Sequence, residues 1–214
     1  NAALKEAGYN AIHSGQKTYN GVAIISPHAL EDVSMGIPGL NDEQKRVIVA
    51  TVQGVRIVCA YIPNGQSLDS DKYQYKLGWL EALHRYLQEE LQRHPNLALL
   101  GDYNIAPADE DVHDPAAWIG QVLVSEPERE AFRGLVGLGL HDSFRLFEQE
   151  PGSFSWWDYR MAGFRRNLGL RIDHILVSQP LLAHCLRCWI DKAPRKLERP
   201  SDHTPVVLEL SALP

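Results

Sequence analysis

The 214-residue chain has 44% apolar residues, enough for one sizeable core and a single domain, and a formal charge of −6, whereas general nucleic-acid binders are usually basic. An acidic total still permits DNA as a ligand, because a cation site needs carboxylates and phosphate contacts can be local. No stretch approaches eighteen consecutive apolar residues, which excludes a predicted membrane span, and three cysteines make no disulfide framework but fit a reducing compartment.

Apolar periodicity and turn residues predict the elements in chain order. Residues 1–7 are predicted to be the tail of a helix that Gly8 ends. The pattern then predicts strands over 21–26, 45–52 and 54–62, a helix over 72–94, a strand over 97–100, a helix over 128–138, and strands over 153–159, 171–178 and 204–210. An irregular stretch follows residue 101 and runs to about 126. Helices between strands of both hairpin and buried type predict an α/β sandwich of two sheets, with the topology open.

A carboxylate and an amide follow the strand over 97–100. Asp102 should emerge at the strand's end, and Asn104 can point the same way if the chain stays extended. The carboxylate can transfer a proton or bind a metal, and the amide can donate to a phosphate oxygen. The alternative is an ordinary Asp turn ahead of a proline loop.

A second polar group, Ser-Asp-His at 201–203, directly precedes the last predicted strand. Asp173 could hold His203 in one tautomer and support its charged form, with His203 as a general base or a phosphate ligand and Asp202 serving a metal. Taken alone, His203 could equally be a core histidine. Together, these carboxylates, amide and imidazole suit a hard divalent cation and an acid/base pair, which is the equipment of phosphodiester hydrolysis.

For the aromatic residues near predicted loops, a packing role and a ligand-contact role both remain open. Tyr61 ends a strand just before a turn with Asn64, so its hydroxyl could meet a phosphate or simply pack with a solvated tip. Trp156 and Trp157 face opposite ways if they lie in a strand, so one is predicted to be core and the other could line a sugar pocket or stack on a base. The Cys185-x-x-Cys188 pair lacks a second ligand pair and is predicted to be buried thiols.

These segments resemble exonuclease III and its relatives, the Mg-dependent apurinic/apyrimidinic endonucleases of the endonuclease/exonuclease/phosphatase superfamily. Gly-Asp-x-Asn and Ser-Asp-His indicate the superfamily, while Gly-Gln-Lys at 15–17 and Phe-Ser-Trp at 154–156 indicate the DNA-repair branch. The resemblance covers nearly the whole chain and runs through residues 15–23, 61–65, 101–107, 142–145, 154–160, 169–173 and 201–203.

The resemblance implies a four-layered, DNase I-like α/β sandwich and roles for individual residues. Asp102 would activate water or protonate the leaving oxygen, Asn104 would be a transition-state donor, and Asp173 would pair with His203. Tyr61 would be the active-site tyrosine and Asn64 a phosphate contact. The remaining expected roles are metal binding by Asp102, Asn104, Asp202 and His203, an abasic-sugar pocket of Trp156, Leu170 and Ile172, and DNA contact by Arg171.

The resemblance also implies a cofactor, partners and a location. The cofactor would be Mg²⁺, with Mn²⁺ as a substitute, and the substrate double-stranded DNA with abasic sites or 3′ ends, acted on by a cytoplasmic, bacterial-type monomer. The chain departs from the family in one respect: roughly fifty residues that members carry at the N-terminus, with a metal-binding Glu, have no counterpart here. The alternatives are a phosphatase or lipid phosphodiesterase of the same superfamily, and a catalytically defective DNA-binding fragment.

Overall fold

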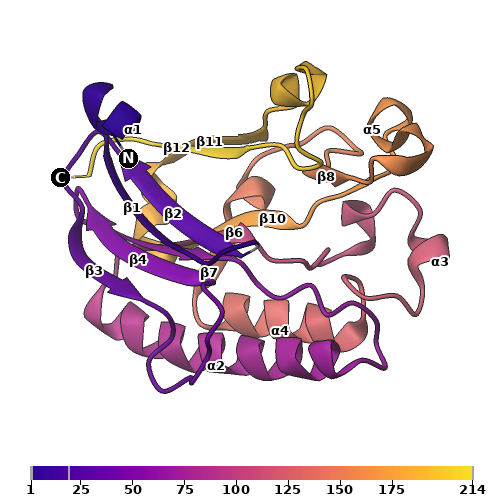
Figure 1. Cartoon of the computed structure of the whole chain (residues 1–214), viewed down its shortest axis with the longest axis horizontal. Coiled ribbons are helices and arrows are strands. Elements are labelled where there is room, and N and C mark those ends of the chain that lie inside the picture. Colours follow the sequence, from indigo (N-terminus) through magenta and orange to yellow (C-terminus); the bar gives the residue numbers. More distant parts are fainter. Residues whose placement is uncertain (1, 19, 214) are drawn as a thin grey trace.

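The computed structural model describes residues 2–18 and 20–213, and a six-stranded sheet lies at its centre (Figure 1). Its strand order is β3-β4-β5-β6-β10-β7; β5 and β6 run parallel, and the other neighbours are antiparallel. The strands are Glu31–Met35 (β3), Val47–Val52 (β4), Val55–Ala60 (β5), Leu97–Asp102 (β6), Leu140–Asp142 (β7) and Asp173–Ser178 (β10).

Two antiparallel hairpins cover one face of this sheet. They are Asn10–Gly15 (β1) with Gly21–Ser26 (β2), and Cys185–Ile190 (β11) with Val206–Leu210 (β12). Ile24 packs with Ile48 and Ala50, while Leu208 packs against the cluster of Ala98 and Val177. A third, very short pair joins Trp156–Trp157 (β8) to Gly169–Leu170 (β9). Position 19 of the family-like segment 15–23 lies outside the described residues.

Two long helices cover the other face. They are Asp71–Arg93 (α2) and Glu126–Gly137 (α4). The short helices are Ala2–Glu6 (α1), Pro115–Trp118 (α3) and Gly163–Arg166 (α5). Short 3₁₀ segments occur at Asp109–Asp111, Ser143–Leu146, Arg160–Ala162, Gln179–His184 and Ala193–Lys196. Helix α2 begins where the Ser70 side chain accepts from the Tyr73 N–H, and the next residue after its C-cap is Pro95. Among the described residues, no helix combines the length and the apolar character needed to cross a membrane.

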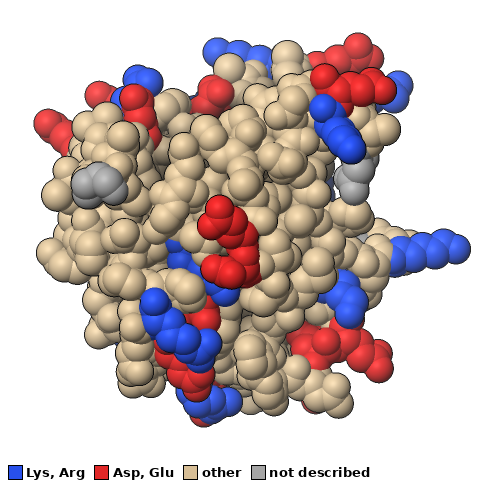
Figure 2. Space-filling view, turned by 90° about the vertical axis from the view of Figure 1, so that its left-hand side faces the viewer, with Lys and Arg blue, Asp and Glu red and all other residues tan. Residues whose placement is uncertain are grey.

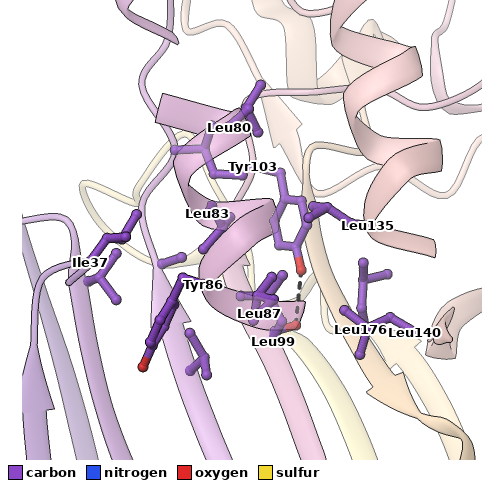
Figure 3. Packing of buried hydrophobic residues seen from close by; sticks show 14 of the residues in the cluster. Ile37, Leu80, Leu83, Tyr86, Leu87, Leu99, Tyr103, Leu135, Leu140 and Leu176 are labelled. Carbon is purple, nitrogen blue, oxygen red and sulfur yellow. Dashed lines mark hydrogen bonds between the residues drawn. The ribbon is translucent and has the colours of Figure 1, made fainter. Parts of the chain in front are cut away.

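The main core fills the space between the helices and the sheet (Figure 3). Leu83 and Leu87 of α2 and Leu99 of β6 are fully buried there. Tyr103, also fully buried, donates its hydroxyl to the Leu99 carbonyl at 3.0 Å, which satisfies its polar atom inside the core. Because both faces of the sheet are covered, β4, β5 and β6 are nearly continuous apolar runs instead of alternating ones.

The structure confirms the predicted α/β class with two packed β layers and most of the predicted elements. The strand predicted over 153–159 shrinks to Trp156–Trp157, because the flanking residues form loops. Five of the described strands were not predicted: β1, β3, β7, β9 and β11. Strand β3 is an exposed, charged edge strand, and β7 has three residues, so neither carries the apolar run that marks a strand in sequence.

Figure 2 shows the face toward the chain termini, at the left of Figure 1. On the described residues visible there, acidic and basic side chains are interspersed and do not gather into a patch of one sign. The surface charge of this face therefore gives no indication of a DNA-backbone footprint.

Candidate active site

Two strand ends bring the predicted carboxylates together. Strand β6 ends at Asp102, β10 begins at Asp173, and the antiparallel register makes these two residues direct partners. Side chains of cross-strand partners lie on the same face, so both carboxylates face one open cleft of about 630 Å³. Tyr61, Asp202 and His203 line the same cleft.

Gly101 is required by the close approach of two strands just before Asp102. Its φ is +141°, and a Cβ there would lie 2.0 Å from the Ala60 carbonyl oxygen. Any other residue would push β5 and β6 apart at the point where the cleft begins. The Gly-Asp pair of the motif is therefore a packing requirement followed by a functional group.

His203 completes the cluster from the segment that leads into β12. Its Nδ1 lies 2.9 and 3.1 Å from the two carboxylate oxygens of Asp173, and its Nε2 lies 3.9 Å from Asp102 Oδ2. Burial by itself would lower the pKa of His203, but the hydrogen bond and charge of Asp173, with the charge of Asp102, raise it to about 9. The imidazole is thus cationic at neutral pH, with Nδ1–H donating to Asp173 and Nε2–H toward the cleft.

Asp102 has an unusually basic carboxylate. Burial and the neighbouring Asp173 charge raise its pKa to about 7, against the lowering effect of His203. Its side chain is 18% exposed, so it is reached from the cleft. A carboxylate with this pKa can accept and return a proton near neutral pH, which an ordinary aspartate does poorly.

Asn104 holds Asp102 in place and is itself braced by Asn64. The backbone N–H of Asn104, in the left-handed region at φ +49°, donates to Asp102 Oδ1 at 2.8 Å, and its Nδ2 donates to Oδ2 at 3.1 Å. The same Nδ2 also donates to the Ile62 carbonyl, and Asn64 Nδ2 donates to Asn104 Oδ1 at 2.9 Å. In this orientation both amide hydrogens of Asn104 are used in hydrogen bonds within the protein, whereas the exposed Asn64 keeps one amide hydrogen free.

Tyr61 lies on the cleft wall next to Arg46. The Arg46 guanidinium lies 4.7 Å from the centre of the Tyr61 ring and donates to the Tyr61 carbonyl at 3.0 Å. Burial and the Asp102 charge raise the pKa of the Tyr61 hydroxyl, so it remains a neutral donor at physiological pH. Arg46, which is 7% exposed, was not among the residues predicted for the site.

The tryptophan pair divides as predicted, with Trp157 buried and Trp156 half-buried. Trp156 Nε1 donates to Asp202 Oδ2 at 3.0 Å, which ties its ring to the cleft wall. Leu170 and Ile172 are 0% and 2% exposed and pack in the cluster beneath Trp156. Of the three expected sugar-pocket residues, Trp156 is the one with surface to offer a ligand.

Arg171 corrects one expectation, because it cannot contact DNA from its position. It is 1% exposed, its Nε donates to Asp111 at 2.7 Å, and its Nη2 donates to Asp142 at 2.7 Å. The sequence placed Arg171 between site residues but could not show that its own side chain points inward. Its charge is used to join three segments beneath the site, since a buried guanidinium requires such partners.

His174 belongs to the same buried network and gives the fold a predicted pH dependence. Its Nδ1 accepts from Arg171 and its Nε2 donates to the Ile105 carbonyl, which fixes the neutral tautomer. Burial and the Arg171 charge lower its pKa to about 4. Below pH 6.5 the unfolded chain therefore gains a proton that the folded chain does not, and stability falls as the pH falls toward 4.

We expect this single group to remove about 2–3 kcal/mol of unfolding free energy between pH 7.5 and 4.5. The measurement is urea denaturation in EDTA at both values, for the native chain and His174→Gln. The variant should be less stable at pH 7.5, and the difference should shrink by that amount at pH 4.5. An unchanged difference would show that His174 does not titrate as its contacts imply.

The donor set fits a hard divalent cation. Ligand atoms of Asp102, Asp173 and His203 lie within 4.8 Å of one another. The cationic His203 ring has no free lone pair for a metal, so the carboxylate oxygens are the candidate ligands, and Mg²⁺ needs only one or two of them beside water and phosphate oxygens. Asp202 lies on the wall of the same cleft. Asn104 presents an N–H to Asp102, so in this orientation it is a donor and not a ligand. The described cysteines take no part in any such cluster.

Fold and site together define a phosphodiesterase: an α/β sandwich with an acid/base and cation-binding cluster at its strand ends. Comparison with known proteins agrees. Residues 1–203 match the model of the Endonuclease/Exonuclease/phosphatase family, and the chain belongs to that family. The resemblance drawn from the motifs is thereby confirmed.

Individual relatives are similar over most of the chain. Exodeoxyribonuclease III of Haemophilus influenzae is 36% identical over an alignment that covers 94% of this chain and 80% of that protein. An exodeoxyribonuclease of Bacillus subtilis is also 36% identical, over 78% of this chain and 66% of that protein. A 3′-5′ exonuclease (NExo) from Neisseria meningitidis superposes with a TM-score of 0.96 at 50% identity, covering 98% of this chain and 82% of that one. An AP endonuclease from Archaeoglobus fulgidus superposes with a TM-score of 0.93 at 38% identity, again covering 98% of this chain and 82% of that one.

Proposed function

We propose that this protein is a metal-dependent DNA-repair nuclease of the exodeoxyribonuclease III type, which hydrolyses the phosphodiester 5′ to abasic sites and trims DNA 3′ ends. The observation that carries the proposal is the Asp102–Asp173–His203 cluster, in which one carboxylate is basic enough to move a proton and one imidazole is held cationic. The similarity to nucleases named for both activities supports DNA as the substrate.

Each residue then has a task during attack of water on the phosphorus atom. Asp102 takes the proton of the attacking water, or returns one to the leaving oxygen. His203 donates from Nε2 to a phosphoryl oxygen, while Asp173 holds its other nitrogen. The hydroxyl of Tyr61 is a further donor at the cleft, and the free amide hydrogen of Asn64 is one in the adjoining pocket that Tyr61 also lines. A bound Mg²⁺, held by Asp102 with Asp202 nearby, would polarise the phosphoryl group and neutralise developing charge.

A specific observation favours work at 3′ ends. Two structures of one Neisseria enzyme, described as a 3′-5′ exonuclease and as a 3′ phosphatase bound to a product DNA hairpin, are 50% and 49% identical to this chain, compared with 38% for the archaeal AP endonuclease. The cluster itself suits either reaction, because both place a phosphoryl group against the same donors. We therefore rank 3′-end processing first and incision at abasic sites second.

The test uses three labelled duplexes: one with a 3′ phosphate, one with a recessed 3′ hydroxyl, and one with an internal abasic-site analogue. We expect release of phosphate or nucleotides from a 3′ end with Mg²⁺, and none with EDTA. A sealed, undamaged circular duplex is the matched control and should stay intact. Failure of all three substrates with Mg²⁺ and with Mn²⁺ would overturn the proposal.

The same assay separates the two alternatives. A lipid phosphodiesterase or general phosphatase would hydrolyse a phosphoinositide or sphingomyelin and leave all three duplexes untouched. A non-catalytic DNA-binding protein would retain duplex in a filter assay and cleave nothing at high Mg²⁺. A lipid phosphodiesterase would use the same proton-transfer groups, and we place it below the nuclease because the similar proteins are nucleases. A non-catalytic protein would leave the proton-transfer properties of Asp102 and His203 without a use.

A further inference from the structure

A fully buried lysine lies behind the site and takes no part in the chemistry described above. Lys76, on α2, is 0% exposed, and its ammonium group donates to the Asn104 carbonyl at 2.6 Å, to the Asn64 carbonyl at 3.1 Å and to the Glu128 carboxylate. An ammonium group has three hydrogens, so all of its donors are used. These acceptors come from three separate segments of the chain.

Two of those segments are the loops that carry the asparagines. Asn64 follows β5 and Asn104 follows β6. The Asn64 amide donates to the Asn104 side chain, and the Asn104 amide donates to Asp102. Glu128, also 0% exposed, is fixed in turn by the N–H groups of Leu123 and Ser125, both accepted by its carboxylate. The ammonium group is therefore anchored on one side by a rigid helix start and holds two site loops on the other.

Burying this cation is costly, and it contributes no apolar packing that a leucine could not supply. Asn104 also needs restraint, because its left-handed backbone conformation is one that residues other than glycine adopt at a cost. Without a donor at its carbonyl, Asn104 could relax to φ below zero, and the N–H that it aims at Asp102 would turn away.

We propose that Lys76 is a positioning residue: it clamps the Asn64 and Asn104 loops so that Asn104, braced by the Asn64 amide, holds the Asp102 carboxylate in its working orientation. The clamp acts on backbone carbonyls and contributes no group to the cleft. Its effect on turnover rests on the proposed function, whereas its effect on Asn104 does not.

The test replaces both charges at once, because removing Lys76 alone would leave the Glu128 carboxylate buried without a partner. The test variant is Lys76→Met with Glu128→Gln. The matched control is Arg56→Met with Glu90→Gln, which removes another buried ion pair, at 2.8 Å with side chains 6% and 3% exposed, that also involves α2 but lies away from the cleft. Both double substitutions are expected to lower thermal stability.

The first readout is hydrogen exchange of the Asn104 side-chain amide by NMR, with Asn104→Ala to assign the signal. The amide is buried and donates to Asp102 and Ile62, so it should exchange slowly in the native chain. We expect exchange about tenfold faster in the test variant and unchanged in the control. Equal exchange in both would overturn the proposal, whether or not the protein cleaves DNA.

The second readout is turnover on the duplex that the native chain cleaves. The test variant should lose about 100-fold in kcat, the cost of a displacement near 1 Å at a reacting group, while the control stays within about twofold. Added to Asn104→Ala, the test substitutions should cause little further loss, because both act through the same carboxylate. If the fold loss of the test substitutions and that of Asn104→Ala multiply in the combined variant, the proposal is overturned. If the test variant does not fold, Lys76→Gln with Glu128→Gln, which removes both charges but keeps an amide donor, is compared in the same way.

A native chain that cleaves none of the duplexes would count against the proposed nuclease function alone. The exchange readout would then still decide whether Lys76 holds the Asn104 loop.

Discussion

Replacing Asp102 by asparagine is expected to lower the rate of DNA cleavage by about a thousandfold, because proton transfer by a positioned group contributes 10²–10⁴ to such reactions. Asparagine keeps the size of the side chain and can still accept the Asn104 backbone N–H through its oxygen. It cannot take a proton from water, and it offers a cation one neutral oxygen where Asp102 offers a charged carboxylate. The fold should persist.

The measurement is the single-turnover rate with Mg²⁺ on the duplex that the native chain cleaves, with DNA affinity followed separately by fluorescence anisotropy. Affinity should stay within a few fold, since backbone contacts dominate it. Asp109→Asn is the control: that carboxylate is 72% exposed, pairs with Arg129 and should change the rate less than twofold. An Asp102→Asn rate within tenfold of native would remove Asp102 from the proton-transfer role.

Asp173→Asn is expected to reduce turnover about 10²- to 10³-fold by acting through His203. In the native chain both Asp173 oxygens lie within 3.1 Å of His203 Nδ1, and this contact keeps the pKa of the imidazole raised to about 9. An amide gives neither the charge nor a fixed acceptor. His203 should then be neutral at pH 7.5 in most molecules and free to rotate its ring.

Two readouts test this paired action. The pKa of His203, followed by NMR of the ring in metal-free buffer, should fall by more than one unit in Asp173→Asn. The double variant with His203→Ala should be no slower than His203→Ala alone, because Asp173 would have nothing left to orient. A native-like imidazole pKa in Asp173→Asn, or losses that multiply in the double variant, would contradict the pairing.

The site was predictable as far as it depends on strand ends. A polar residue directly after a buried apolar run leaves the sheet at its edge, so Asp102 and His203 could be placed at strand ends from sequence alone. The sequence could not show that Asp102 and Asp173 are direct neighbours. Their pairing depends on the antiparallel register of β6 and β10, whose residues are about seventy positions apart.

The missed residues are those whose function depends on which way a side chain points. Arg171 was expected at the DNA and is buried; it lies between β9 and β10, where no strand alternation indicates the direction of its side chain. Lys76 had a readable signal: it lies four residues before Leu80 and seven before Leu83, on the apolar face of α2. A lysine at such a position requires a buried partner, but the sequence cannot indicate that this partner is Glu128.

The sequence by itself determined the layers and the chemical inventory, because apolar runs and helical spacing dictate what must be buried, and the motif residues carry proton-transfer and cation-binding groups wherever they lie. The tertiary structure alone decided which of those groups act together. The raised pKa values of Asp102 and His203 arise from mutual charge and burial, and the positions of Asn64 and Asn104 depend on a lysine from another layer. Such properties belong to distances between segments, and distances exist only after the chain has folded.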